Sequence, residues 1–330
     1  MNALFHPIRI RSLVIPGNLF LAPVAGYTDR AFRSLCAEQG ADFSFTELVS
    51  SEALVRGGVK TDALLRRGEE EQRYAVQLFG ADPLVMYRAA SLLLPYAPEA
   101  VDINCGCPVP KVVKAGAGSG LMRNPALLGR VVEAVLRASR EFLAEVPVTV
   151  KLRSGWDASS LNYRECAEAA VQAGAALVSL HARTRAQGYE GRSDWSHIAD
   201  LASRLEVPVV GSGDLFCPED AEQMLRETGC AAVMFARGAM GNPFIFAQTR
   251  SLLCTGAYSA PLAVDRIRLG FRHLVMLASN LGEGVACREM RKQFCAYTKG
   301  MAGGAPLRNR LVHAETVAEY RALLQDYLEK

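Results

Sequence analysis

Two cysteines lie in the string Asn104-Cys105-Gly106-Cys107-Pro108, directly after an apolar run that is typical of a buried strand. A thiol with an ordinary pKa of about 8.5 is mostly protonated at neutral pH, so it can act as a general acid. A C-x-C pair can also be half of a metal site, but no second cluster of cysteine and histidine has matching spacing. We therefore expect a proton donor here and no metal.

Polar residues occupy alternate positions inside several apolar runs that should be buried. They are Gln77, Asp102, Asn104, Thr149, Lys151, Arg153, Ser179, His181 and Arg183. Successive side chains of a strand point to opposite faces, so the polar members of each run share one face. In a barrel that face points inward, and the bulkiest members lie at strand C-termini, where barrel active sites are built. A solvated rim is the alternative, but so many polar positions on four strands rarely converge by chance.

Two glycine-rich segments follow later apolar runs and suit a phosphate group. Residues 211–214 read Gly-Ser-Gly-Asp, and residues 236–239 read Ala-Arg-Gly-Ala. Glycine lets backbone amides approach an anion closely, and Arg237 can pair with its charge. This pattern predicts a phosphate-bearing ligand, a feature that many barrels share. The segment Gly116–Gly120 lacks the GK[ST] of a P-loop, so we interpret it as a mobile loop beside the site.

Eight short apolar runs alternate with amphipathic helical patterns. The runs are Leu19–Ala25, Phe43–Val49, Tyr74–Gly80, Val101–Cys105, Val148–Arg153, Leu177–Arg183, Val207–Ser212 and Ala231–Ala236. The clearest helical patterns between them are Asp29–Gln39, Pro83–Leu94, Pro125–Ala138, Tyr163–Ala173 and Pro218–Glu227. Strands that alternate with helices pair in parallel through right-handed crossovers. Eight such units predict an α/β fold, a (β/α)8 TIM barrel, because an open doubly wound sheet usually has fewer strands and a G-x-G-x-x-G after the first.

The ends of the chain differ from this repeating pattern. Residues Ile8–Ile15, followed by Pro16-Gly17, predict a small hairpin that closes the bottom of the barrel. From about residue 245 the pattern is helical, with turns near Thr255–Pro261 and Gly303–Pro306. We therefore expect a barrel domain over residues 1–244 and a small all-helical C-terminal domain over residues 245–330.

Composition limits the class of protein. The chain has 330 residues, half of them apolar and 22% charged, and its nine cysteines include no C-x-x-C pair. No uncharged apolar run reaches the length of a membrane span, and the N-terminus has no signal-peptide core, so we expect a cytoplasmic protein with reduced thiols. Residues 245–330 hold 12 lysines and arginines against 7 aspartates and glutamates, a net charge of +5, whereas residues 1–244 hold 25 against 27, a net charge of −2. A basic tail indicates a polyanionic partner.

These motifs together resemble the tRNA-dihydrouridine synthase family, and its bacterial B-type most. The resemblance spans nearly the whole chain and rests on Leu21–Asp29, Val76–Gly80, Val101–Pro108, Val150–Trp156 and His181–Thr184. It implies a reduction of the uracil C5–C6 double bond in tRNA that depends on tightly bound FMN and takes its electrons from NADPH. A hydride would pass to C6, and a cysteine would protonate C5.

The resemblance also assigns roles to individual residues. Cys107, which immediately precedes a proline, matches the family's acid, and Asn104 would position the uracil, with Arg153 and Arg183 as further substrate contacts. The flavin would be bound by Pro23, Val24, Ala25, Gln77, Lys151, His181, Ser212, Gly213, Asp214, Ala236, Arg237 and Gly238. Gln77 would bond the pyrimidine edge of the flavin, and Lys151 would stabilise the anionic reduced ring. The family usually has asparagine at Ser212, glycine at Ala236 and methionine at Val24, and we expect FMN to be retained.

The C-terminal region is similar to the family's helical RNA-binding domain. Arg288, Arg291, Lys292 and Lys299 are spaced to lie roughly on one helix face, and the resemblance implies that this face contacts tRNA. A solvated charged face is the alternative. The target uridine is buried in folded tRNA, so the enzyme must extract the base, and a large anchoring surface helps it to do so.

Two other functions are compatible with parts of this pattern. An FMN barrel dehydrogenase that acts on a free pyrimidine would need no basic helical tail. A non-catalytic RNA-binding protein with an inherited barrel would be expected to lack the acid or the flavin contacts, whereas Cys107, Lys151 and His181 are all present. The sequence specifies neither the uridine that is reduced nor the oligomeric state.

Overall fold

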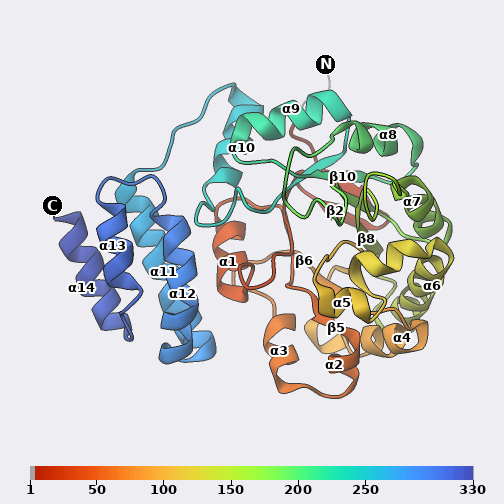
Figure 1. Ribbon diagram of the computed structural model, residues 1–330, viewed down its shortest axis with the longest axis horizontal. Coiled ribbons are helices and arrows are strands. Elements are labelled where there is room, and N and C mark those ends of the chain that lie inside the picture. The colour runs from red at the N-terminus through yellow and green to blue at the C-terminus, as the bar shows by residue number, and fades with distance from the viewer. Residues whose placement is uncertain (1–3, 330) are drawn as a thin grey trace.

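The computed structural model describes residues 4–329 and shows a closed ring of parallel strands with helices around it (Figure 1). The strands follow one another around the ring in chain order, and pairing of β4 with β6 closes it. They are β3 (Leu19–Leu21), β4 (Phe43–Phe45), β6 (Tyr74–Phe79), β7 (Ala100–Asn104), β8 (Val148–Arg153), β9 (Val178–His181), β10 (Val209–Ser212) and β11 (Ala232–Phe235). Each overlaps one predicted run, so the predicted TIM barrel is confirmed. A two-residue strand, β5 (Val49–Ser50), pairs with β6 beyond β4.

The predicted N-terminal hairpin is present. Strands β1 (Ile8–Ile10) and β2 (Leu13–Ile15) pair antiparallel, with Ile8 opposite Ile15. Ile8, Ile10 and Ile15 are buried against residues from the N-terminal ends of the barrel strands, including Phe20 and Phe43. The hairpin therefore fills the bottom of the barrel, and the opposite end remains for a ligand.

Helices cover the outside of the ring and start where the sequence provides caps. Asp29 accepts hydrogen bonds from two amides of α1 (Arg30–Glu38), and Asp82 does the same for α4 (Pro83–Ser91) with proline in the first turn. The remaining barrel helices are α2 (Ser51–Val55), α3 (Val59–Leu65), α5 (Pro110–Lys114), α6 (Pro125–Phe142), α7 (Tyr163–Gln172), α8 (Ser196–Arg204), α9 (Pro218–Thr228) and α10 (Ile245–Thr255), with short 3-10 helices η1 (Leu94–Tyr96) and η2 (Gly118–Arg123). Their apolar faces pack on the strands and form the main core.

The expectation of a mobile loop at Gly116–Gly120 is wrong. Most of it belongs to η2, where Gly118 and Ser119 are buried and the Ser119 amide donates to the carbonyl of Cys107 at 3.0 Å. Gly118 has a φ of 59°, and a Cβ there would lie 2.7 Å from the Cys107 carbonyl oxygen. The glycines thus permit close packing beneath the cysteine, and the sequence pattern alone could not distinguish packing from mobility.

Four further helices stand together at one side of the barrel, beside α1 (Figure 1). They are α11 (Ala263–Leu281), α12 (Glu283–Tyr297), α13 (Gly304–Leu311) and α14 (Val317–Leu328), and they have a core of their own. Ala31 and Leu35 of α1 are part of that core. Within the described residues, no helix combines the length and apolar character that a membrane span needs.

Helix α10 bears on the expected domain boundary at residue 245. Ile245 and Phe246 are buried in the barrel core, and α10 packs against α9 and β3. The separate helical core starts with α11. We therefore propose that the barrel domain includes α10 and that the boundary lies in the segment 256–262. The expected boundary at 245 coincides with the start of α10, because the strand pattern ends before that residue and the helical pattern begins there.

Candidate active site

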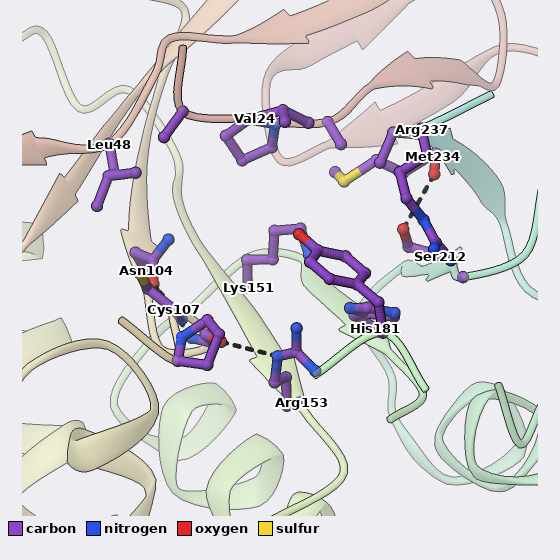
Figure 2. Close-up of a pocket in the computed structure, with 18 of the residues that line it drawn as sticks. Val24, Leu48, Asn104, Cys107, Lys151, Arg153, His181, Ser212, Met234 and Arg237 are labelled. Carbon is purple, nitrogen blue, oxygen red and sulfur yellow. Dashed lines mark hydrogen bonds between the residues drawn. The ribbon is translucent and has the colours of Figure 1, made fainter. Parts of the chain in front are cut away.

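Most of the predicted site residues line one pocket at the C-terminal ends of the barrel strands (Figure 2). Those that do so are Pro23, Val24, Ala25, Asn104, Cys107, Lys151, Arg153, His181, Ser212, Gly213, Asp214, Ala236 and Arg237. Figure 2 shows Asn104 and Cys107 at one end, Ser212 and Arg237 at the other, and Lys151 and His181 between them. Gln77, Arg183 and Gly238 do not line this pocket.

Cys107 is held at the pocket by bonds to its backbone. Asn104, the last residue of β7, accepts hydrogen bonds through Oδ1 from the amides of Gly106 and Cys107, at 3.2 and 2.9 Å. The amide of Ser119 holds the Cys107 carbonyl from the other side. These bonds fix the turn between β7 and α5, so the thiol has a defined place beside the cavity.

The two cysteines of the C-x-C string have different environments. Cys107 is half-buried and lines the pocket, whereas Cys105 is fully buried in the core between barrel and helices. Burial raises the pKa of the Cys107 thiol, and the Val109 amide and Arg153 oppose this rise. The thiol is therefore protonated at neutral pH, as a general acid must be before it gives up its proton. Among residues 4–329, no group of three or more histidines, cysteines, aspartates or glutamates is placed to hold a metal.

A chain of buried hydrogen bonds connects the pocket to the middle of the barrel. Asn104 Nδ2 donates to Gln77 Oε1 at 2.8 Å, and Gln77 Nε2 donates to Asp102 Oδ2 at 2.7 Å. Thr149 donates to the other oxygen of Asp102 at 2.5 Å. The alternation of polar and apolar residues along the strands predicted that these polar side chains meet inside the barrel. Gln77 lies one layer below the pocket and fixes the Asn104 amide, so a direct bond from Gln77 to a ligand requires the ligand to reach past Asn104.

Lys151 and Asp102 form the charged centre of this layer. Burial raises the pKa of Asp102 to about 6, although Thr149, Gln77 and the charge of Lys151 oppose that rise. Burial also lowers the pKa of Lys151 to about 8, helped by Arg153 and opposed by Asp102. At pH 7 the lysine is mainly protonated and the aspartate mainly ionised, so each supports the charge of the other. From its place in the polar alternation Asp102 was expected to point inward, with no role in the chemistry.

His181 is a neutral hydrogen-bonding group in this structure. Burial and the surrounding cations, first among them Lys151, lower its pKa to about 2. Its Nε2 lies 3.4 Å from Nη1 of Arg183, and a guanidinium can only donate. Nε2 is then the acceptor, the ring proton is on Nδ1, and His181 can offer an N–H to a ligand in the pocket.

Arg153 and Arg183 use most of their donors in hydrogen bonds within the protein. Arg153 donates to the carbonyls of Gly106, Thr184 and Gly188, each at 2.9 Å, and so ties the cysteine loop to the loop after β9. Arg183 is buried away from the pocket, where it bonds Asp214 and two carbonyls of its own loop. The expectation that Arg183 contacts the substrate does not fit this placement. The alternation of polar residues correctly predicted that Arg183 lies on the inward face. Only the fold shows that its guanidinium is paired with the carboxylate of Asp214.

The end of the pocket predicted to bind phosphate combines glycine loops with a paired arginine. Asp214 bonds Arg183 and also Arg237, the latter at 3.1 Å, so its side chain serves as a counterion and is not itself suited to an anion. A Cβ on Gly213 would lie 2.3 Å from Ser193 Oγ, and one on Gly238 would lie 2.1 Å from the Leu215 carbonyl oxygen. Gly213 thus lets the loop after β10 approach the loop after β9, and Gly238 lets the loop after β11 approach the loop after β10.

The backbone donors at this end are available to a ligand. The amides of Gly213, Asp214 and Arg237, which line the pocket, have no hydrogen-bond partner within residues 4–329, and neither has the amide of the next residue, Gly238. Converging free amides next to an arginine are suited to a phosphate group. Ser212 directs its hydroxyl to the Met234 carbonyl at 3.0 Å (Figure 2). Both Ser212 and Ala236 line the pocket.

Several lining residues were not predicted from the sequence. Leu48, Tyr189, Phe216 and Met234 all line the pocket. Tyr189 and Phe216 are more than half exposed, and both rings lie near the Arg237 guanidinium carbon, at 4.7 and 5.1 Å. An aromatic residue in a polar, glycine-containing loop directly after a barrel strand is the signal that would have indicated them.

Arg288, Arg291 and Lys292 lie in α12, whereas Lys299 lies beyond its last residue, and Arg291 and Lys292 have different neighbours. Lys292 pairs with Glu289, and its Nζ lies 5.6 Å from the centre of the Tyr27 ring, at the barrel loop after β3. Arg291 lies near Tyr320 of α14, where burial raises the pKa of the tyrosine to about 12 and the charge of Arg291 opposes that rise. Arg288 is exposed. Successive residues of a helix are rotated by about 100° around its axis, so the neighbouring side chains of Arg291 and Lys292 diverge.

Over nearly its whole length, the chain is similar to known proteins. The family model described as dihydrouridine synthase (Dus) matches residues 20–330. A Treponema pallidum protein named "Probable tRNA-dihydrouridine synthase" is 50% identical over 330 residues, which cover 98% of this chain and 97% of that protein. The tRNA-dihydrouridine synthase B of Xanthomonas campestris is 36% identical over 98% of this chain and 96% of its own, and that of Pseudomonas aeruginosa is 36% identical over the same shares.

Solved structures with the same fold are more distant. An old yellow enzyme homologue from Zymomonas mobilis has a TM-score of 0.53 and 14% identity, over 80% of this chain and 96% of that chain. Morphinone reductase in complex with tetrahydroNAD has a TM-score of 0.53 and 16% identity, over 79% and 92%. At these identities the likeness shows the barrel fold alone.

Proposed function

This chain belongs to the dihydrouridine synthase (Dus) family, and from that premise we propose that it reduces uridines in tRNA to dihydrouridine. The proposal includes FMN as cofactor, NADPH as electron donor and Cys107 as proton donor. The observation that carries it is the pocket itself, in which a protonated thiol, a buried ammonium and a neutral imidazole lie between an apolar wall and a phosphate-type end. The relatives bear the same activity in their names.

The residues present fit FMN in its chemical groups. The free amides at residues 213, 214, 237 and 238, with Arg237, would hold the phosphate. Lys151 and the Nδ1–H of His181 would face acceptor atoms of the ring, and Pro23–Ala25 would line its apolar side. When bound and reduced by NADPH, the flavin would supply a hydride to C6 of the uracil.

The protein's own part in the reaction is to place the base and supply the proton. We assign the proton transfer to C5 to Cys107, whose S–H bond breaks as the C5–H bond forms. The thiolate left behind recovers a proton from solvent, so the overall reaction consumes one uridine, one NADPH and one proton. Arg153, close enough to lower the pKa of that thiol, would stabilise the thiolate. Asn104, fixed through Gln77 and Asp102, would position the uracil.

The test is direct. The purified protein is incubated with FMN, NADPH and an unmodified tRNA transcript, and nucleosides are measured by mass spectrometry. We expect dihydrouridine to form at one or a few positions only when NADPH is present. Conversion of free uracil or uridine at a comparable rate would favour an FMN barrel dehydrogenase for free pyrimidines. RNA binding by a protein that neither holds flavin nor forms dihydrouridine would favour a non-catalytic RNA-binding protein.

A further inference from the structure

Two arginines share one tryptophan ring beside the pocket. The guanidinium carbon of Arg123, in η2, lies 5.0 Å from the centre of the Trp156 ring, and that of Arg185 lies 4.7 Å from it. Trp156 belongs to the loop after β8, and Arg185 to the loop after β9. We refer to Arg123, Trp156 and Arg185 as the rim platform.

The loops that carry the platform are fastened to each other. The amides of Arg185 and Ala186 donate to the carbonyls of Gly155 and Trp156, each at 2.8 Å. Asn162, which follows β8, donates through Nδ2 to the carbonyl of Met122 in η2 at 2.7 Å. The platform is therefore assembled by backbone bonds before any ligand arrives, which lowers the entropy cost of binding.

Neither arginine of the platform has an anionic partner within residues 4–329. No ion pair or side-chain hydrogen bond involves Arg123 or Arg185, and Nε of Arg185 is buried without a partner. The adjacent acid, Asp157, directs its carboxylate to Ser159 and Ser160. Other arginines on the barrel flank do have an acidic partner, as Arg204 has in Asp200 and Arg226 has in Glu222.

Two unpaired like charges so close together favour an anion. Both guanidinium carbons lie near one ring, so they are within about 10 Å of each other, one Debye length at 0.1 M salt. A guanidinium stacked on an aromatic ring keeps its N–H edge free, and that edge matches the oxygens of a phosphate. Helix α5, which packs against η2, adds the exposed Lys111 and Lys114.

The platform adjoins the pocket through one loop. Arg153, which lines the pocket, bonds the carbonyls of Thr184 and Gly188 on either side of Arg185. Tyr189 of the same loop also lines the pocket. A nucleotide strand with one base in the pocket would therefore have its neighbouring backbone near this loop.

We propose that the rim platform binds backbone phosphates of the RNA strand that carries the target uridine. This inference rests on the proposed function, and it names a barrel surface, separate from the helical domain, as a part of the RNA site. Trp156 orients the two guanidinium groups, and Arg123 and Arg185 contact the phosphates.

The test compares the FMN-loaded protein with the double variant Arg123→Ala, Arg185→Ala, using a labelled unmodified tRNA transcript across a range of salt concentrations. We expect the double variant to bind about tenfold more weakly at 0.1 M salt and to flatten the slope of log affinity against log salt by about 1 to 2. The matched control is Arg204→Ala, Arg226→Ala, which removes the same charge from the barrel flank and should leave the slope as it is. Flavin content and thermal denaturation exclude misfolding, and the exposed Arg123→Ala alone should give about half of the change in slope.

Three results would overturn the inference. A double variant with the affinity and slope of the parent protein would show that no phosphate contacts the platform. A slower reduction of the flavin by NADPH in RNA-free solution would instead assign the platform to phosphates of the dinucleotide. A parent protein that does not bind tRNA at all would remove this inference together with the proposed function, whereas a parent that binds and reduces tRNA keeps the two separable.

Discussion

The floor of the pocket (Gln77, Asp102, Asn104 and Lys151) and its rim (Arg123, Trp156 and Arg185) differ in how charge is balanced. Charges of the floor are compensated, and charges of the rim are not. On the floor, Lys151 and Asp102 compensate each other, and Gln77 and Asn104 are held in one hydrogen-bonded chain. On the rim, Arg123 and Arg185 lie near one indole ring with no carboxylate partner in the described chain. The floor is built on strands and the rim on the loops that follow them.

This difference separates two tasks. Groups that must act on a reacting atom are fixed beforehand in a low-dielectric interior, where they are effective without reorganisation. Groups that must hold a long polyanion remain unpaired at the surface, where released counterions drive binding. Changes on the floor should therefore alter rates without altering salt dependence, and changes at the rim should do the reverse.

The largest effect should come from Cys107. We expect Cys107→Ala to lower turnover on tRNA about 10²–10⁴-fold, because general acid catalysis contributes that much. Single-turnover kinetics should place the loss in reduction of the uridine and not in reduction of the flavin by NADPH. Cys105→Ala is the control, since that thiol lies in the core, outside the pocket. If Cys105→Ala were the inactive variant, the acid would have been assigned to the wrong thiol.

A smaller but still large effect is expected at Lys151. Lys151→Met removes the cation that we propose lies beside the flavin ring, and it should reduce flavin affinity or the rate of flavin reduction by about 10²–10³-fold, by analogy with lost oxyanion donors. It also leaves the buried carboxylate of Asp102 without its opposing charge. Flavin content and stopped-flow reduction measure the effect. Normal values in this variant would place Lys151 away from the flavin, and Lys151→Arg should retain part of the function.

The charge of Asp102 should affect the pH dependence of flavin reduction. Its pKa of about 6 and the pKa of about 8 of Lys151 predict that flavin reduction falls below pH 6, as the carboxylate is protonated, and above pH 8, as the ammonium is lost. Asp102→Asn keeps the acceptor for Gln77 but removes the charge. We expect the acidic limb to disappear and the alkaline limb to move to lower pH. A uniform loss of activity with an unchanged profile would mean that Asp102 acts only in packing.

The smallest effect is expected from the helical domain. Lys292→Ala should weaken tRNA binding several-fold and flatten the salt slope by about one unit at most, because its ammonium lies at the barrel loop. Arg291→Ala should change the slope less, since its guanidinium lies towards α14. Titrations of both variants against Arg204→Ala decide this. A larger change from Arg291 than from Lys292 would contradict the orientation of α12.

The inward-facing residues of the strands could be predicted wherever polar and apolar residues alternate. The inward phase of β7, β8 and β9 identified Asn104, Lys151 and His181, because a strand buried on both faces carries a polar side chain only where it has a partner or a task. Caps at Asp29 and Asp82 were equally local. Tyr189 and Phe216 were missed because a loop has no periodicity from which to infer where its side chains point.

By itself the sequence determined the eight strands, the hairpin below them, the helices from about residue 245 onward and the family, since each depends on local pattern or on a string of neighbouring residues. Only the tertiary structure decided which cations are free. Arg183 is paired with Asp214, Arg153 bonds three carbonyls, and Arg185 has no anionic partner in the part of the chain that the structure describes. The physical reason is that the availability of a charge depends on partners distant in sequence, and contact between two loops follows from how the strands close into a ring.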